Sequence, residues 1–189
     1  MTTPTREKLI HEANLLMRDR GYSAFSYADL SKKIGISKAS IHHHFASKEI
    51  LGEQVIIAAS KETEQRLTHI YQEDLTTIGR LERYMEVFSE NLQTSLLPLC
   101  CALSAELSNL PDTVKIQTNY YFNLQINWLA KILKEGKDLG ELRVDLDENG
   151  MALTIFSIFE GTSVVVRVLN NLELFKQSLE QIKVLIHAK

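Results

Sequence analysis

The stretch of sequence that decides the fold is residues 34–51, which read IGISKASIHHHFASKEIL. Gly35-Ile36-Ser37 is typical of a turn of about three residues, and the Ser37 hydroxyl can cap a helix that we expect over residues 38–44. Upstream, Ser26 can cap another helix that ends at Gly35, with Asp29 at its third position able to reach back. Two short helices joined in this way form a helix-turn-helix, whose second helix can enter the major groove of DNA.

The helices on either side of this motif are predicted by their spacing and caps. Pro4 suits the first turn of a helix, and apolar residues follow at helical spacing until Gly21 stops it. Ser47 opens a long fourth helix that runs toward Leu67. An apolar set can pack the two short helices together and onto the first: Ala28, Leu30, Ile34, Ile36, Ile41 and Phe45. This packing leaves five residues of the motif available outward: Lys38, Ala39, Ser40, His42 and His43.

Residues 34–51 resemble the pattern of the tetracycline-repressor-like (TetR/AcrR) regulators. In that family a glycine-containing turn, a short helix ending in aromatic residues and a Ser-Lys-Glu-x-Leu segment follow in order. The resemblance covers about residues 5–55 and extends to the remainder only in length and helical layout. Ala39 stands where glycine is common in the family, and His42 where tyrosine is common. The resemblance implies an all-helical homodimer that binds a palindromic operator through the motif.

The motif and the resemblance together give a set of expected DNA contacts. Sequence reading is expected from Lys38, Ala39, Ser40, His42 and His43. Phosphate contacts are expected from Tyr27, His44 and Lys48, because a lysine in the first turn of a helix can hold a phosphate together with backbone N–H groups.

Plainer interpretations of these residues stand beside DNA binding. Residues 42–44 could be a metal site, but consecutive residues of a helix point about 100° apart, so three histidines in a row cannot ligate one ion. We therefore expect no metal and no cofactor. Lys32, Lys33 and Lys38 could be solvated surface charges, and the capped turn around them is what favours DNA.

The composition of the 189 residues favours an all-α chain, with 44% apolar residues, three prolines and eight glycines. The net charge of −3 is unevenly distributed: residues 1–60 hold eight Lys and Arg against six Asp and Glu, and the remainder holds thirteen against eighteen. Cys100 and Cys101 are adjacent, so no disulfide framework is expected. We find no run of about 18 apolar residues and no signal-peptide layout, which predicts a cytoplasmic protein without a membrane span.

Beyond the motif, the sequence predicts five further helices. We expect them over residues 81–96, over 99–107, from Pro111 to Gly140, from Asp147 onward and over 172–186. The helix from Asp147 is apolar nearly all the way round, so it needs burial on more than one side. In the family that the motif resembles, the last two helices pair with their twins from a second subunit. Ordinary intramolecular core is the alternative.

Polar groups among large apolar ones predict a small-molecule effector site in the C-terminal part. The candidates, each of which has plain core as its alternative, are Met85, Phe88, Cys101, Tyr121, Trp128, Phe156 and Glu160. The cysteine pair supports a rival mechanism in which a thiolate reacts with an oxidant or electrophile. Because residues 96–103 are apolar, and apolar burial raises the pKa of a thiol, we favour small buried side chains there.

We therefore expect about nine helices in two domains, a helix-turn-helix DNA-binding domain over residues 1–50 and an effector-binding and dimerisation domain over residues 51–189. The predicted function is a transcriptional repressor that a small-molecule effector releases from its operator. A thiol-based sensor and an architectural DNA binder without effector are the alternatives. An enzyme is disfavoured, because no nucleophile-elbow, phosphate-loop or zinc-ligand spacing occurs.

Overall fold

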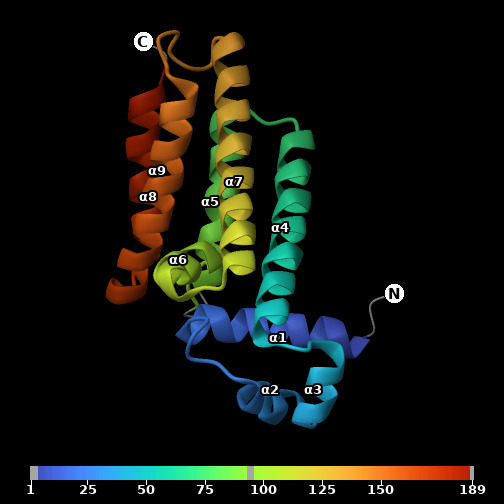
Figure 1. The fold of residues 1–189 in the computed structure, drawn as a ribbon. Coiled ribbons are helices and arrows are strands. Elements are labelled where there is room, and N and C mark those ends of the chain that lie inside the picture. Colours follow the sequence, from blue (N-terminus) through green and yellow to red (C-terminus); the bar gives the residue numbers. More distant parts are fainter. Residues whose placement is uncertain (1–3, 93–95, 188–189) are drawn as a thin grey trace. The chain divides into compact units, whose positions relative to one another are not determined.

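The fold is all-α, as the computed structural model of the chain shows (Figure 1). The structure describes residues 4–92 and 96–187. In this part of the chain nine α-helices follow one another: α1 (Pro4–Arg20), α2 (Tyr27–Ile34), α3 (Lys38–His44), α4 (Lys48–Gln72), α5 (Thr77–Leu92), α6 (Leu99–Ser104), α7 (Asp112–Asp138), α8 (Glu148–Leu169) and α9 (Glu173–Ile186). A short 3₁₀ helix, η1 (Leu107–Asn109), precedes α7. The predicted fold class is confirmed.

The helices form two compact units. The head unit contains the described residues up to Glu62 together with Leu99–Tyr121, and the body unit contains the described residues of Thr63–Pro98 and Phe122–Lys189. Helices α4 and α7 each contribute residues to both units. These units are defined by packing, whereas the predicted boundary at residue 50 separates two functions. That functional boundary stays a prediction.

The core of the head unit joins the apolar faces of α1 to α4. Leu30, Ile41 and Phe45 of the predicted packing set are buried there, and Ile34 and Ile36 pack against the edge of the core. The same core contains residues of α6, of the segment after it and of the start of α7, all of which the sequence assigned to the C-terminal domain: Leu99, Leu103, Leu110 and Val114. By packing, α6 therefore belongs with the helix-turn-helix.

The caps of the helix-turn-helix are those that the sequence predicts. The Ser26 N–H donates to Asp29 Oδ2 over 2.8 Å, and the Asp29 N–H donates to Ser26 Oγ over 3.4 Å, which makes a capping box at the start of α2. Gly35 ends α2 at a φ of +80°, in the left-handed region that favours glycine. Ser37 Oγ then accepts the Ser40 N–H over 3.1 Å and starts α3.

The body unit packs α5 against α8 and α9 around an aromatic centre. The centroid of the Tyr84 ring lies 5.3 Å from that of Phe88, 5.5 Å from that of Trp128 and 5.9 Å from that of Phe159. Helix α5 begins at Thr77 rather than at residue 81, because the hydroxyl of Thr76 accepts the Gly79 N–H over 3.2 Å and caps it earlier. Residues 93–95 of the predicted helix lie outside the described residues.

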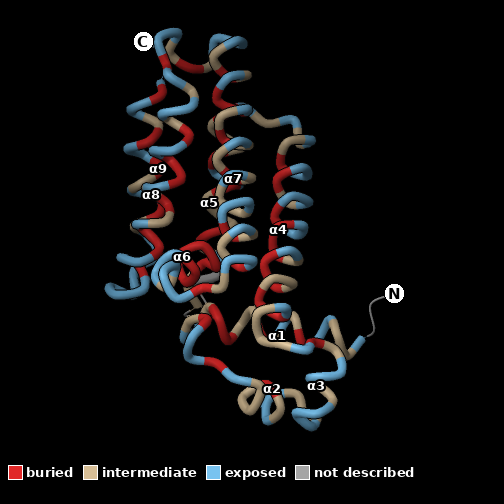
Figure 2. The backbone as a smooth tube through the Cα atoms, in the orientation of Figure 1, coloured by how far each residue is buried: buried red, intermediate tan, exposed pale blue. Residues whose placement is uncertain are grey.

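Two other helices differ from the prediction. Helix α6 ends at Ser104, and the last residues of the predicted helix over 99–107 lead into η1. Helix α8 buries one face, formed by Ala152, Ile155, Phe156, Phe159, Thr162, Ser163 and Val166. Five of its other apolar residues are exposed in the single chain, among them Val168 at 78% and Leu169 at 62% (Figure 2). In the single chain α8 is therefore buried on one face, and not on more than one side as the sequence predicts.

The expectation that no segment could span a membrane also needs a correction. By length and composition alone, α8 is apolar enough to cross a bilayer, although the core helix of a soluble protein meets the same criterion. The sequence argument missed it because Thr, Ser and Gly interrupt the apolar run without lowering the mean hydropathy enough.

Candidate nucleic-acid interface

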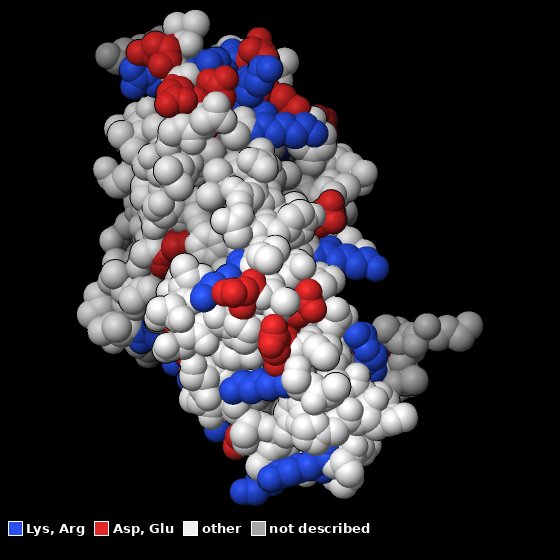
Figure 3. All heavy atoms as spheres, viewed as in Figure 1, with Lys and Arg blue, Asp and Glu red and all other residues white. Residues whose placement is uncertain are grey.

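The outer face of the helix-turn-helix presents most of the predicted base-reading residues. Lys38, Ala39, His42 and His43 are exposed, and Ser40 and His44 are half-buried. The buried residue of α3 is Ile41, which anchors the helix in the head core. Figure 3 shows Lys and Arg side chains along the end of the head unit that α2 and α3 form. A short helix with one buried residue and a polar outer face suits insertion into a groove.

Tyr27 is committed to the interior of the motif. Its hydroxyl donates to the carbonyl oxygen of Phe45 over 2.9 Å, and its ring meets the His42 ring edge to face at a centroid distance of 4.8 Å. Burial, with a smaller effect of Tyr22, raises the pKa of Tyr27 to about 12, so the phenol keeps its proton. Because that single proton is directed at Phe45, Tyr27 has none to donate to a phosphate.

Lys48 lies against the junction between α1 and α2. Its ammonium is 4.7 Å from the centroid of the Tyr22 ring and 4.5 Å from that of Phe25, and it donates to the Ser23 carbonyl oxygen over 3.2 Å. Burial lowers the pKa of Lys48, and the charges of Glu106 and Asp29 act in the opposite direction. An ammonium has three N–H donors, so this position leaves donors for a phosphate while it fixes the side chain.

Glu106 is a head-unit residue that contacts the junction between α1 and α2. Its Oε2 accepts the Ser23 N–H over 2.8 Å. A Cβ built on Gly21 would lie 1.6 Å from Glu106 Oε1, and Gly21 has a φ of +90°. Both backbone polar groups of Ser23 are thus bound by side chains, its N–H by Glu106 and its C=O by Lys48. The glycine at position 21 was the one sequence signal of a close approach.

The predicted effector residues are divided between the two units. Cys101 and Tyr121 belong to the head unit, where Cys101 is buried and Tyr121 packs against the core. The other five belong to the body unit: Met85, Phe88, Trp128, Phe156 and Glu160. Phe88 and Trp128 are part of its aromatic centre, and the Trp128 indole N–H donates to the Leu67 carbonyl oxygen over 3.1 Å. Their role in binding an effector stays a prediction.

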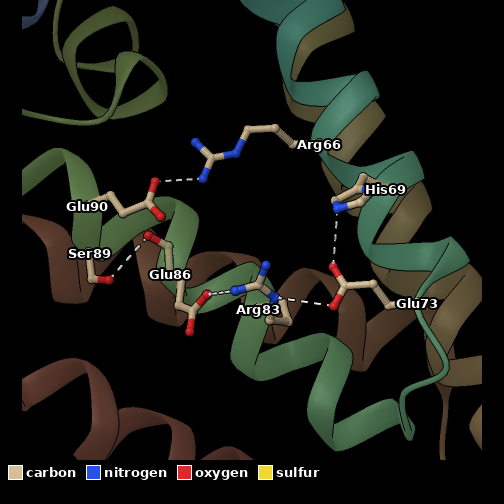
Figure 4. Close-up of polar contacts among 7 residues, drawn as sticks. All are labelled: Arg66, His69, Glu73, Arg83, Glu86, Ser89 and Glu90. Carbon is tan, nitrogen blue, oxygen red and sulfur yellow. Dashed lines mark hydrogen bonds and ion pairs between the residues drawn. The ribbon is translucent and has the colours of Figure 1, made fainter.

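The last third of α4 is tied to α5 by a chain of ion pairs within the body unit (Figure 4). Arg66 contacts Glu90 over 2.6 Å, and Arg83 contacts both Glu73, over 3.5 Å, and Glu86. His69 lies 3.8 Å from the other oxygen of Glu73. These side chains are partly or fully solvated, so each pair contributes about 1 kcal/mol or less.

Comparison with known proteins agrees with this architecture. Residues 9–55 match the family model described as bacterial regulatory proteins of the tetR family, and residues 77–182 match the tetracyclin repressor-like C-terminal domain. The chain is 26% identical over 178 residues to the HTH-type transcriptional repressor DhaR of Mycobacterium sp. (strain GP1), covering 94% of this chain and 89% of DhaR. It is 28% identical over 162 residues to the nucleoid occlusion factor SlmA of Vibrio cholerae, covering 83% of this chain and 81% of SlmA.

Solved structures of similar proteins have the same fold. A TetR-family regulator from Agrobacterium tumefaciens superposes with a TM-score of 0.91 at 25% identity and covers 97% of both chains. A TetR regulator from Legionella pneumophila superposes with a TM-score of 0.87 at 25% identity and covers 98% of both chains. The likeness therefore extends over head and body residues alike.

Proposed function

The chain belongs to the TetR family of bacterial regulatory proteins and is a DNA-binding transcriptional regulator, and we propose that it is a repressor released from its operator by a small-molecule effector. The observation that carries the proposal is the capped helix-turn-helix, whose α3 keeps one buried anchor and an exposed polar face. Support for a repressor also comes from DhaR, which is a transcriptional repressor. With DNA as its partner, we place its action in the cytoplasm.

The proposed DNA contacts follow from the exposure of each side chain of the motif and from the hydrogen-bonding groups that it does not use within the fold. Base reading is assigned to the exposed or half-exposed residues of α3: Lys38, Ala39, Ser40, His42 and His43. Lys48 and His44 are assigned to phosphates, Lys48 through the N–H donors that Ser23 does not take. Tyr27 is assigned the positioning of His42, since its proton is directed at Phe45.

Family members dimerise, and we propose that this chain does so through α8 and α9. The support is a set of exposed apolar side chains on these two helices: Leu153, Val164, Val165, Val168, Leu169, Leu172, Val184 and Leu185. A two-fold dimer would present two copies of α3 about one turn of DNA apart, so the operator would be a palindrome.

The effector would act by binding more tightly to the form of the dimer that fits DNA poorly, since equal affinity for both forms shifts nothing. The proposed contacts of the body unit are Met85, Phe88, Trp128, Phe156 and Glu160. An apolar and aromatic lining of this kind suits an apolar effector with one or two polar groups.

The experiment that tests the function is selection of binding sites from a random duplex pool, followed by titration of the selected duplex. Lys38→Ala should weaken binding of the dimer to the selected sequence by about 30-fold or more, because it removes two base contacts, each worth about 1 to 3 kcal/mol. Lys134→Ala removes the same charge from an exposed position on α7 and should leave affinity within twofold. A purified protein that is monomeric and shows no sequence preference at low salt would refute the proposal.

A further inference from the structure

One side chain of α3 has its hydrogen-bonding chemistry fixed by the fold. His42 Nδ1 lies 3.2 Å from the carbonyl oxygen of Ala46, just beyond the end of α3. A carbonyl oxygen can only accept a hydrogen bond, so Nδ1 must carry the hydrogen. A neutral imidazole has a single N–H, and Nε2 is therefore an acceptor with a free lone pair.

The ring of His42 is also fixed in place. The Tyr27 ring packs against it with an interplanar angle of 63°, and Tyr27 is itself anchored by its hydrogen bond to the Phe45 carbonyl. Two successive carbonyl oxygens after α3, those of Phe45 and Ala46, are thus each bound by a ring from the motif. Within residues 4–92 and 96–187 no hydrogen bond involves Nε2, and His42 is exposed. The acceptor is therefore available on the outer face of α3.

We propose that His42 reads an exocyclic amino group in the major groove, adenine N6 or cytosine N4, by accepting a hydrogen bond at Nε2. These two amino groups are the hydrogen-bond donors of the major groove, whereas guanine N7 and O6 and thymine O4 are acceptors. Phosphate oxygens are acceptors as well, so a neutral His42 with this tautomer is matched to a base rather than to the backbone. The inference rests on the proposed function, and it assigns one A or C to each half-site.

The alternative is that His42 only closes the end of α3, and two substitutions separate these roles. In His42→Asn the short amide can place an N–H near the position of Nδ1, which keeps the contact to Ala46 and removes the acceptor. In His42→Gln the longer amide can place an oxygen near the position of Nε2, which keeps the acceptor and gives up the contact to Ala46. A purely structural role predicts loss in His42→Gln and tolerance of His42→Asn, the reverse of the proposal.

The test uses the full-length protein and its selected duplex at about pH 8, where imidazole is ordinarily neutral. Each adenine is replaced in turn by purine, which lacks the 6-amino group, and each cytosine by pyrimidin-2-one, which lacks the 4-amino group. The wild type should lose about fivefold in affinity at one such position per half-site, the usual effect of one hydrogen bond. His42→Asn should bind the unmodified duplex about 25-fold more weakly, because both subunits of the dimer lose the contact, and it should be insensitive at that position, while His42→Gln should stay sensitive.

Whether the sensitive position is an adenine or a cytosine identifies the amino group. The inference alone is overturned if His42→Asn keeps the wild-type sensitivity at every position, or if wild type and His42→Asn select the same bases with equal affinity. A wild-type protein that selects no sequence from the pool overturns the proposed function and this inference together. Thermal unfolding of both variants checks that each is folded when its affinity is measured.

Discussion

The junction between α1 and α2 gives a prediction in which two glycines of similar backbone conformation should differ in cost. Gly21 has a φ of +90° and Gly35 a φ of +80°. A Cβ at Gly35 would have no heavy atom within 4 Å, whereas a Cβ at Gly21 would lie 1.6 Å from Glu106 Oε1 and 2.8 Å from its Cδ. Gly21→Ala must therefore displace the Glu106 carboxylate, and Gly35→Ala displaces nothing.

The magnitudes follow from the two contributions. Placing an alanine in the left-handed region costs about 1 to 2 kcal/mol, and this applies to both variants. Gly21→Ala also removes the hydrogen bond from the Ser23 N–H to Glu106, which we put at about 1 to 2 kcal/mol, the low part of the range for charged partners, because Ser23 is exposed. We expect Gly21→Ala to lose about 2 to 4 kcal/mol and Gly35→Ala about 1 to 2 kcal/mol.

Thermal unfolding at one fixed protein concentration measures the difference, since dimer stability depends on concentration. For a chain of this length the two variants should differ in Tm by about 2 to 8 °C. Adding Glu106→Ala to Gly21→Ala removes the clash, so the double variant should lose less than the sum of the two single variants. Equal Tm values for Gly21→Ala and Gly35→Ala would show that Glu106 does not occupy the space beside Gly21.

Three further predictions concern the dimer, the phosphate contact and the acid limit of stability. Val168→Glu should give monomers in a sedimentation experiment. The control variant Val144→Glu changes a residue that is 87% exposed and outside α8 and α9, so it should leave the dimer intact. If both variants were dimers, α8 would not lie in the interface. Lys48→Met keeps an apolar stem against the two aromatic rings, so it should stay folded. It should reduce the slope of log affinity against log salt by about two, one for each subunit of the dimer; an unchanged slope would make Lys48 structural only. The Lys137 ammonium lowers the pKa of Glu148 by a hydrogen bond over 2.6 Å, so this carboxylate contributes stability above its unfolded pKa and loses it as pH falls through the lower folded value. Glu148→Gln should therefore flatten the acid side of a stability–pH curve, and identical curves would contradict the assignment.

The helix-turn-helix could be predicted from the sequence because its determinants are local. Ser26 and Ser37 each cap a helix through an amide three residues away, and Gly35 ends α2 through its own left-handed backbone. Such contacts follow from the order of residues, whatever the rest of the chain does. The same holds for the start of α5, where Thr76 is a capping residue that the periodicity of the apolar residues concealed.

Contacts between residues far apart in sequence could not be predicted in this way. Glu106 and Ser23 are separated by 83 positions, and the apolar pattern of α6 indicates burial without indicating a partner. The spacing that placed Lys48 in the first turn of α4 was correct, but it did not reveal that the ammonium lies over two aromatic rings. The sequence likewise predicted a phosphate contact for Tyr27 without revealing its hydrogen bond. The structure shows that the Tyr27 hydroxyl donates to the Phe45 carbonyl oxygen.

The apolar outer face of α8 needs a partner, and the charges on the helix favour a second copy of the chain over a lipid bilayer. Glu160 and Arg167 both lie within α8, and a charged side chain at the centre of a bilayer costs about 2.5 to 3.5 kcal/mol even on the most lenient scale. The buried face of α8 packs on α5 and α9, so insertion would also have to expose or strip the aromatic centre of the body unit. A two-fold contact requires neither, because it covers the exposed valines and leucines of α8 and leaves its packing on α5 and α9 intact.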